Sequence, residues 1–156
     1  MKRSLVIVAL LSFILVWGSC IKDTSCKDKS VQSEQAAILS YASANGINAT
    51  AHSSGMYYEV VNPGSGVVPT PTSKVFVSYT GKLLDGTVFD IQNNPSVTGW
   101  QLNGLIQGWQ IGLPLIHKGG TIRLLVPSSL GYGCNGFGSV PGNSILYFEI
   151  YLADVQ

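Results

Sequence analysis

Few side chains in this sequence could carry out proton transfer or nucleophilic attack. The chain has two histidines, His52 in a polar stretch and His117 before the turn-like run Lys118-Gly-Gly120. Nucleophilic catalysis needs a base beside the nucleophile, and we interpret both histidines as solvated loop residues. The eight acidic residues form no cluster typical of a metal site or a glycosidase pair, and no cysteine spacing indicates zinc. We therefore expect neither a metal nor another cofactor.

One glycine-rich run matches the sequence pattern of a nucleotide-binding motif but lacks the structural context of that motif. Gly131-Tyr-Gly-Cys-Asn-Gly136 has the G-x-G-x-x-G pattern. A dinucleotide site also needs a helix after the glycines, with its N-terminus facing the pyrophosphate. Here a loop with glycine and proline follows, and then a predicted strand. We therefore reject a dinucleotide-binding site.

The remaining candidates are aromatic residues near predicted turns. Any one of them alone is typical of a hydrophobic core, and only their order along the chain indicates a function. The set comprises Tyr79, Phe89, Trp100, Trp109, Tyr132, Phe137 and Phe148.

Short strands are the elements that must hold these aromatic residues. Apolar and polar residues alternate in residues 56–61, 121–126 and 146–153, as expected for strands with one buried face. The spacing in residues 75–79 predicts a further strand. Asp85-Gly86 lies between two strand-like runs, which is typical of a hairpin.

One helix is predicted between these strands. Its residues at helical spacing are Leu105, Trp109, Gly112 and Leu113. Asn103 is the predicted N-cap, and Pro114 ends the helix because it lacks a donor and restricts the residue before it. We therefore infer an α+β domain, in which an antiparallel sheet of about five strands wraps across one short helix.

Composition agrees with a single folded domain. The chain has 156 residues, of which 46% are apolar and 11% are charged, and 18 glycines and seven prolines suit short strands and tight turns. The net charge is +1, and without Lys2 and Arg3 the seven basic and eight acidic side chains give −1. Nucleic-acid binders carry basic patches, so we expect no nucleic-acid partner.

The first 19 residues are typical of a bacterial lipoprotein signal peptide. Lys2 and Arg3 precede an apolar run from Leu5 to Trp17, which spans about 20 Å as a helix and is too short for a bilayer core of about 30 Å. Gly18-Ser-Cys20 resembles a lipobox, so we predict lipidation of Cys20, although Trp17 stands where that pattern prefers leucine. An ordinary signal peptide with an incidental thiol is the alternative.

The mature chain begins with a predicted tether, residues 20–30, and a helix and linker, residues 31–55. Ser30 or Ser33 can cap this helix and Gly46 can end it. Either packing on the domain or self-association would use its apolar face, and we favour packing. An exported chain can keep disulfides, so a bridge between Cys26 and Cys134 is one alternative; we favour unpaired cysteines, because a bridge would tie a flexible tail to a distant loop.

Four blocks in unbroken order give residues 56–156 a family resemblance. The chain is similar to the FKBP family of peptidyl-prolyl cis–trans isomerases, and with its leader it resembles a bacterial lipoprotein form preceded by an N-terminal helix. The resemblance implies an FKBP-like fold. The blocks are Val77–Asp90, Leu105–Leu113, Gly119–Gly133 and Pro141–Ile150.

The resemblance also implies roles for individual residues. Trp109 corresponds to the floor of the proline pocket, with the backbone N–H of Ile106 as donor to the substrate carbonyl and the Tyr132 hydroxyl as a second substrate contact. The expected catalytic set is Tyr79, Phe89, Asp90, Trp109, Tyr132 and Phe148. The expected substrate-binding set is Trp100, Leu105, Ile106, Phe137 and Val140, of which Phe137 and Val140 belong to the covering loop.

Some positions depart from the family pattern. Trp100 is the only aromatic between Pro95 and Leu102, and Phe137 stands where other members carry histidine.

Three functions are considered for this chain. The first hypothesis is an isomerase acting on X-Pro bonds of exported proteins, with a macrolide as possible inhibitor. The second is a non-catalytic module or chaperone that binds proline-containing segments, and the third is a structural lipoprotein with a decayed pocket. The predicted location is the cell envelope, on a lipid anchor, with the outer membrane preferred.

Overall fold

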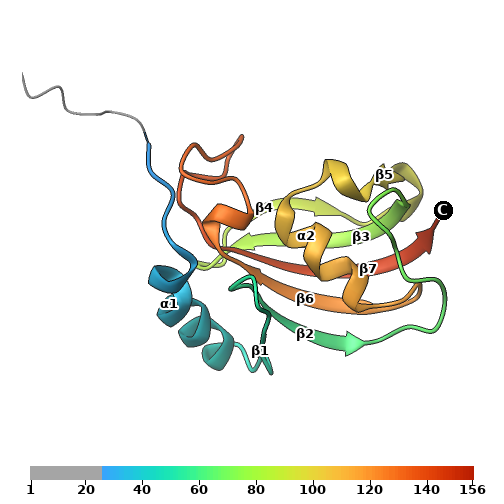
Figure 1. Cartoon of the computed structure of the whole chain (residues 1–156), viewed down its shortest axis with the longest axis horizontal. Coiled ribbons are helices and arrows are strands. Elements are labelled where there is room, and N and C mark those ends of the chain that lie inside the picture. Colours follow the sequence, from blue (N-terminus) through green and yellow to red (C-terminus); the bar gives the residue numbers. More distant parts are fainter. Residues whose placement is uncertain (1–25) are drawn as a thin grey trace, which may run out of the picture.

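The computed structural model describes residues 26–156. The predicted signal peptide, Cys20 and residues 21–25 lie outside the described residues. Figure 1 shows a twisted sheet with the helix α2 across one face and the helix α1 beside the end of the sheet where β6 and β7 are joined. Within residues 26–156, every helix is too short or too polar to cross a membrane.

The sheet is antiparallel throughout and has the order β1-β2-β6-β7-β3-β4, with β5 beside β3. Five strands have five or more residues, which confirms the expected number, and two are short. The strands are β1 (Thr50–Ala51), β2 (Tyr57–Asn62), β3 (Lys74–Leu83), β4 (Val88–Gln92), β5 (Trp100–Gln101), β6 (Thr121–Val126) and β7 (Leu146–Val155).

The predicted hairpin at Asp85-Gly86 is confirmed. It joins β3 to β4, and the Leu83 N–H donates to the Thr87 carbonyl over 2.9 Å. Gly86 has a φ of +92°, a conformation that glycine adopts without steric cost. The turn brings β4 back beside β3, so that Asp90 faces the same region as Tyr79.

The short helix is confirmed, but its predicted start is wrong. The helix α2 is Gln107–Gly112, and its N-cap is Ile106. Asn103 lies instead in a separate 3₁₀ turn, Leu102–Gly104. Leu105 and Ile106 have extended backbone, with ψ of 171° and 149°, so the α-helix begins only after them, and the Gln110 side chain donates back to the Leu105 carbonyl over 2.7 Å.

The predicted end of this helix is only partly right. The α-helix ends at Gly112, but Leu113 keeps helical dihedral angles, φ −64° and ψ −34°, although Pro114 follows it. The chain therefore continues as a 3₁₀ turn, Leu113–Leu115, before it leaves for β6.

Two glycines let α2 lie close to the sheet. A Cβ at Gly108 would come within 2.5 Å of the Val126 side chain, and one at Gly112 within 2.6 Å of Leu124. The two glycines are four residues apart and therefore share one helix face. This close contact places the Trp109 side chain against Tyr79 of β3 and Phe148 of β7.

The N-terminal helix covers the opposite face of the sheet. The helix α1 is Val31–Ala44, and the Ser30 side chain accepts from the Ser33 N–H as predicted. Its buried residues pack in a cluster that comprises Ile38, Ala42, Ile47, Tyr57, Leu125 and Tyr147. Neighbouring residues of a strand point to opposite faces, so at this end of β6 and β7 both faces are covered. The expectation of one buried face is wrong there.

The segment before α1 is attached to the domain. Cys26 and Cys134 form a disulfide with their Cα atoms 5.6 Å apart, which is the alternative that the sequence left open but did not favour. The reason is local docking: the Asp28 carboxylate accepts from the Cys134 N–H over 2.7 Å, and Asn143 bonds to Lys27 and Lys29. Residues 26–30 therefore run along the loop between β6 and β7.

Candidate functional site

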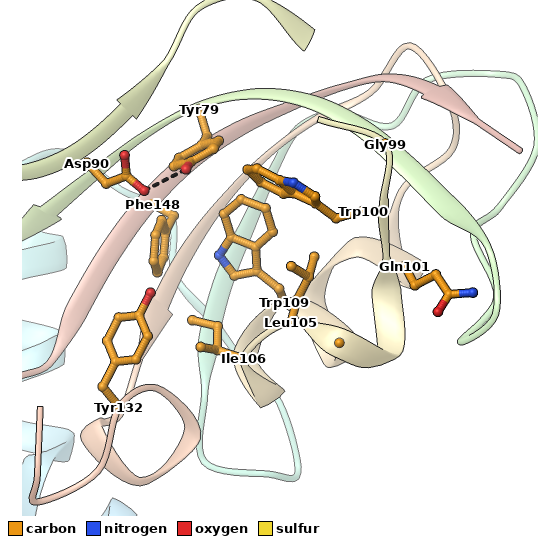
Figure 2. A pocket seen from close by; sticks show the side chains of 11 residues that line it. Tyr79, Asp90, Gly99, Trp100, Gln101, Leu105, Ile106, Trp109, Tyr132 and Phe148 are labelled. Atoms are coloured by element: carbon orange, nitrogen blue, oxygen red, sulfur yellow. Dashed lines mark hydrogen bonds between the residues drawn. The ribbon is translucent and has the colours of Figure 1, made fainter. Parts of the chain in front are cut away.

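A cavity of about 630 Å³ opens where α2, the strands β3, β4 and β7 and the β6–β7 loop meet. Figure 2 shows its side chains converging from these separate elements. Most of the lining is aromatic or aliphatic. The lining residues are Tyr79, Asp90, Gly99, Trp100, Gln101, Gly104, Leu105, Ile106, Trp109, Tyr132 and Phe148.

Trp109 forms the floor of the cavity and is only 4% exposed. Its ring meets Tyr79 and Phe148 edge to face, with centroids 5.0 and 5.3 Å apart and interplanar angles of 86° and 87°. Edge-to-face contacts are favourable because the positive ring edge meets the negative face. The indole is therefore held in one orientation from two sides.

A second layer lies behind these rings. Phe89 packs edge to face on Phe148 with centroids 5.6 Å apart. Gly81 makes room for both rings, because an added Cβ would come within 2.7 Å of Phe89 and 3.0 Å of Phe148. Phe89 thus supports the cavity lining without being part of it.

The polar side of the cavity is organised by a hydrogen bond between two strands. The Tyr79 hydroxyl on β3 donates to the Asp90 carboxylate on β4 over 2.6 Å (Figure 2). Burial and the neighbouring Asp90 charge raise the pKa of Tyr79 well above its usual value. The hydroxyl therefore stays protonated and keeps donating to Asp90 at neutral pH.

Tyr132 brings a second hydroxyl to the cavity from the β6–β7 loop. In Figure 2 its hydroxyl points toward the space between Phe148 and Trp109. Burial, and to a smaller extent the Asp90 charge, raise the pKa of Tyr132. This hydroxyl lines the cavity and, within residues 26–156, makes no hydrogen bond to a protein group, so it is a donor available to a ligand.

Two N–H groups at the floor also lack partners in the described part of the chain. The backbone N–H of Ile106, the N-cap of α2, makes no hydrogen bond there. The indole Nε1 of Trp109 is buried and likewise unpaired within residues 26–156. A buried donor without a partner is costly, so a carbonyl oxygen entering the cavity would gain from either group.

The structure brings eight of the eleven predicted site residues to the cavity. Phe89 lies behind the lining, Val140 is buried in the core, and Phe137 is 71% exposed and stacked on Tyr132 with centroids 5.4 Å apart. The eight are Tyr79, Asp90, Trp100, Leu105, Ile106, Trp109, Tyr132 and Phe148. Their assigned catalytic and binding roles remain predictions.

Three lining residues were missed by the sequence reasoning. They are Gly99, Gln101 and Gly104. Gly99 has a φ of +70°, and a Cβ there would come within 2.9 Å of the Phe76 ring. Its position directly before Trp100 was the available signal, whereas no sequence pattern singles out Gln101 and Gly104.

The arrangement suits the binding of a compact apolar ring with polar groups on one side. Aromatic surfaces enclose the ring, and the Ile106 N–H and the Tyr132 hydroxyl supply donors for its polar groups. Asp90 is the one carboxylate in the lining and already accepts a hydrogen bond from Tyr79. Among residues 26–156, acidic residues, histidines and cysteines form no group of three suited to a metal ion.

Comparisons with known proteins agree with this geometry. The model of the FKBP-type peptidyl-prolyl cis–trans isomerase family matches residues 66–153. FkpA of Escherichia coli K12, an FKBP-type peptidyl-prolyl cis–trans isomerase, is 41% identical over 105 residues, which cover 67% of this chain and 39% of that protein. The FKBP-type 22 kDa isomerase of the same organism is 41% identical over 118 residues, covering 73% and 55%.

A solved structure leads to the same family. The crystal structure of FkpA from Escherichia coli superposes with a TM-score of 0.68 and 35% sequence identity, covering 81% of this chain and 61% of that one. The chain thus spans between about two fifths and just over half of the length of the two curated relatives. The match to the family model covers more than half of the chain, and the chain belongs to the FKBP-type peptidyl-prolyl cis–trans isomerase family.

Proposed function

We propose that this protein is a peptidyl-prolyl cis–trans isomerase that acts on X-Pro bonds of exported proteins. The observation that carries the proposal is the aromatic cavity floored by Trp109, in a chain of this family. A proline ring is compact and apolar, and the peptide group before it carries a carbonyl oxygen that accepts hydrogen bonds.

Amide resonance sets the barrier that the enzyme must lower. Rotation about the bond before proline crosses about 18–20 kcal/mol, and unaided it takes on the order of tens to hundreds of seconds. In the planar amide, resonance places negative charge on the carbonyl oxygen, which water stabilises. In the twisted transition state this charge is smaller, so a cavity that excludes water disfavours the planar state relative to the twisted one.

Each group of the cavity has a role in this scheme. Trp109 and Phe148 hold the proline ring while the residue before it rotates. The Ile106 N–H and the Tyr132 hydroxyl donate to carbonyl groups of the substrate and fix its position. Asp90 holds Tyr79 in place through the 2.6 Å hydrogen bond. No covalent bond forms and no proton is transferred, which is consistent with the absence of a nucleophile–base pair in the sequence.

The isomerase proposal is tested by relaxation of a proline peptide. Protein expressed from its full sequence and purified in mild detergent is added to Ala-Leu-Pro-Phe enriched in the cis form, with and without a macrolide inhibitor. We expect a faster cis-to-trans relaxation that the macrolide suppresses. A rate equal to the uncatalysed one, from protein with intact melting behaviour, would contradict the proposal.

The second candidate function is non-catalytic binding of proline-containing segments. It is favoured by the rim of the cavity, where Trp100 is 37% exposed and Phe137 is 71% exposed, because exposed aromatic side chains can hold an apolar chain segment. In the assay above, a binding module would retain the peptide without changing its relaxation rate.

The location of the protein is part of the proposal. The apolar run Leu5–Trp17 followed by Gly18-Ser-Cys20 supports export and lipidation of Cys20, and the Cys26–Cys134 disulfide supports an oxidising compartment. We expect the Cys20→Ser variant to leave the membrane fraction and to lose incorporation of labelled palmitate. An unchanged distribution and label would contradict the anchor and leave the isomerase proposal intact.

A further inference from the structure

A buried carboxylate joins α1 to the loop that carries Tyr132. Glu34 lies in the first turn of α1 and is only 2% exposed. Its Oε2 atom accepts a 2.8 Å hydrogen bond from the backbone N–H of Ser128, which is itself fully buried. Glutamate is almost never fully buried unless it is paired, and within residues 26–156 the Glu34 side chain bonds only to Ser128, through Oε2, while Oε1 has no partner. The carboxylate therefore has a reason to be there beyond helix packing.

Ser128 is in turn hydrogen-bonded to the two residues beside Tyr132. Its carbonyl accepts from the N–H of Gly131 over 3.0 Å and from the N–H of Gly133 over 2.8 Å. These two glycines flank Tyr132 on both sides. Ser128, whose N–H is bonded to Glu34, thus holds through its carbonyl the backbone before and after Tyr132.

A second anchor lies just beyond Tyr132. Cys134 is bonded to Cys26 through the disulfide and donates its N–H to the Asp28 carboxylate over 2.7 Å. Tyr132 therefore lies between two points, Ser128 and Cys134, that are both tied to residues 26–34. These anchoring residues precede residue 66, where the match to the family model begins.

We propose that Glu34 is a positioning residue that fixes Tyr132 at the cavity and so determines how well the site uses its hydroxyl. A hydrogen bond to a carboxylate is shorter and about twice as strong as one between neutral groups. The Glu34–Ser128 bond acts on the β6–β7 loop, whereas Ile38 and Ala42 hold α1 on the sheet. The catalytic part of this inference rests on the proposed isomerase function, and the structural part stands without it.

The test compares three variants of the protein expressed from its full sequence. Glu34→Leu removes the acceptor, Glu34→Gln keeps an acceptor oxygen, and Gln35→Ala removes a neighbouring bond to Tyr57 without touching the loop. Two quantities are measured well below the melting temperature: kcat/KM for the proline peptide, and hydrogen exchange of the Gly131 and Gly133 amides.

We expect Glu34→Leu to lower kcat/KM about tenfold, because misplacing a group by 1 Å can cost up to about a hundredfold. The same variant should speed exchange of both glycine amides about tenfold or more. Glu34→Gln should restore most of both properties, and Gln35→Ala should resemble the wild type. If Glu34→Leu fails to fold, Glu34→Asp, whose carboxylate is one methylene shorter, replaces it.

Two results would overturn the inference. One is an unchanged kcat/KM and unchanged exchange in Glu34→Leu. The other is an equal loss in Gln35→Ala, which would mean that α1 acts only through general docking. If the wild type itself shows no isomerase activity, the proposed function fails, and the exchange of the glycine amides still decides whether Glu34 fixes the loop.

Discussion

The two faces of the sheet use the same strands for different purposes. On one face, α2 and the strands enclose aliphatic residues that end in an open aromatic cavity. On the other face, α1 closes a smaller cluster around Tyr57, Leu125 and Tyr147. Leu124 and Leu125, or Tyr147 and Phe148, are neighbours in sequence but belong to opposite faces. Burial of an aromatic residue therefore does not by itself mark a site, since Tyr57 and Tyr147 near α1 are as buried as Tyr79 in the cavity.

The two faces also differ in which part of the chain builds them. The cavity is built within residues 66–153, the part matched by the family model. The other face depends on residues 26–47, which lie outside it, and is connected to the cavity through Glu34 and the Cys26–Cys134 bridge. Changes on the two faces should therefore have separable effects on activity and on stability.

The largest effect is expected from Trp109→Ala. It removes the floor of the cavity and should lower kcat/KM about a hundredfold, which corresponds to about 2.7 kcal/mol. Because Trp109 also belongs to the core, the free energy of unfolding should fall by about 3–5 kcal/mol. Peptide relaxation and denaturant unfolding measure the two effects.

The matched control lies on the opposite face. Ile38→Val should lower the free energy of unfolding by about 1 kcal/mol and leave kcat/KM of the folded protein unchanged within about twofold. An equal fall of kcat/KM in both variants would mean that the two faces do not act separately. If Trp109→Ala does not fold, Trp109→Phe tests the floor with a smaller loss of volume.

Removing the disulfide should lower the stability that the N-terminal segment gives to the domain. The double variant Cys26→Ser with Cys134→Ser opens a link between residues 108 positions apart and should lower the free energy of unfolding by about 2–5 kcal/mol. Denaturant unfolding of the wild type and the double variant measures this. Cys20→Ser is the matched control, and its free energy of unfolding should equal that of the wild type. A double variant as stable as the wild type would contradict the structural role of the bridge.

A smaller effect is expected behind the cavity. Gly81→Ala would press a Cβ against Phe89 and Phe148 and should lower the free energy of unfolding by about 1–3 kcal/mol. Gly104→Ala is the control, because an added Cβ there meets nothing within 4 Å, and its stability should stay within about 0.5 kcal/mol of the wild type. Equal stability of both variants in thermal unfolding would show that Gly81 is not needed for the packing of the two rings.

The smallest effect is expected from pH in the neutral range. The pKa values of Tyr79 and Tyr132 are raised by burial and by the Asp90 charge, so both hydroxyls stay protonated and kcat/KM should be flat from about pH 6 to 9. These tyrosines bind their protons more tightly in the folded state. Stability is therefore retained below the usual tyrosine pKa of about 10 and is lost as the pH rises above it.

Melting temperatures from pH 7 to 11, together with kcat/KM over the same range, check this expectation. Tyr147 near α1 also has a raised pKa, chiefly through burial and then through the Glu149 charge, so both faces should lose stability at alkaline pH. A midpoint in kcat/KM between about pH 6 and 9 would show that an ionising group takes part in the reaction.

Much of the fold and of the cavity could be predicted from the sequence. Alternating residues identified the strands, and the Asp85-Gly86 pair identified the hairpin, because both depend on local backbone preferences. The positions of Trp109 and Tyr132 followed from the family resemblance. The start of α2 did not, because Leu105 and Ile106 have extended backbone and separate Asn103 from the helix.

The contacts of the N-terminal segment could not be predicted in this way. An acidic residue in a first helical turn is usually explained by the helix dipole, so nothing in the sequence marks Glu34 as buried against Ser128. The disulfide depends on the docking of Asp28 and on Asn143, which has a φ of +57°. These are contacts between residues about a hundred positions apart, and local patterns do not report them.

Catalysis by the cavity around Trp109 can be observed directly by NMR exchange on a proline peptide in the presence of a small amount of the protein. Unaided exchange takes about 10–100 s at 25 °C, so cis–trans exchange peaks do not develop at sub-second mixing times. We expect the wild type to produce these peaks and Trp109→Ala to abolish them while remaining folded. Peptide signals that shift or broaden with the wild type, without exchange peaks, would show binding without catalysis and rule out the isomerase proposal.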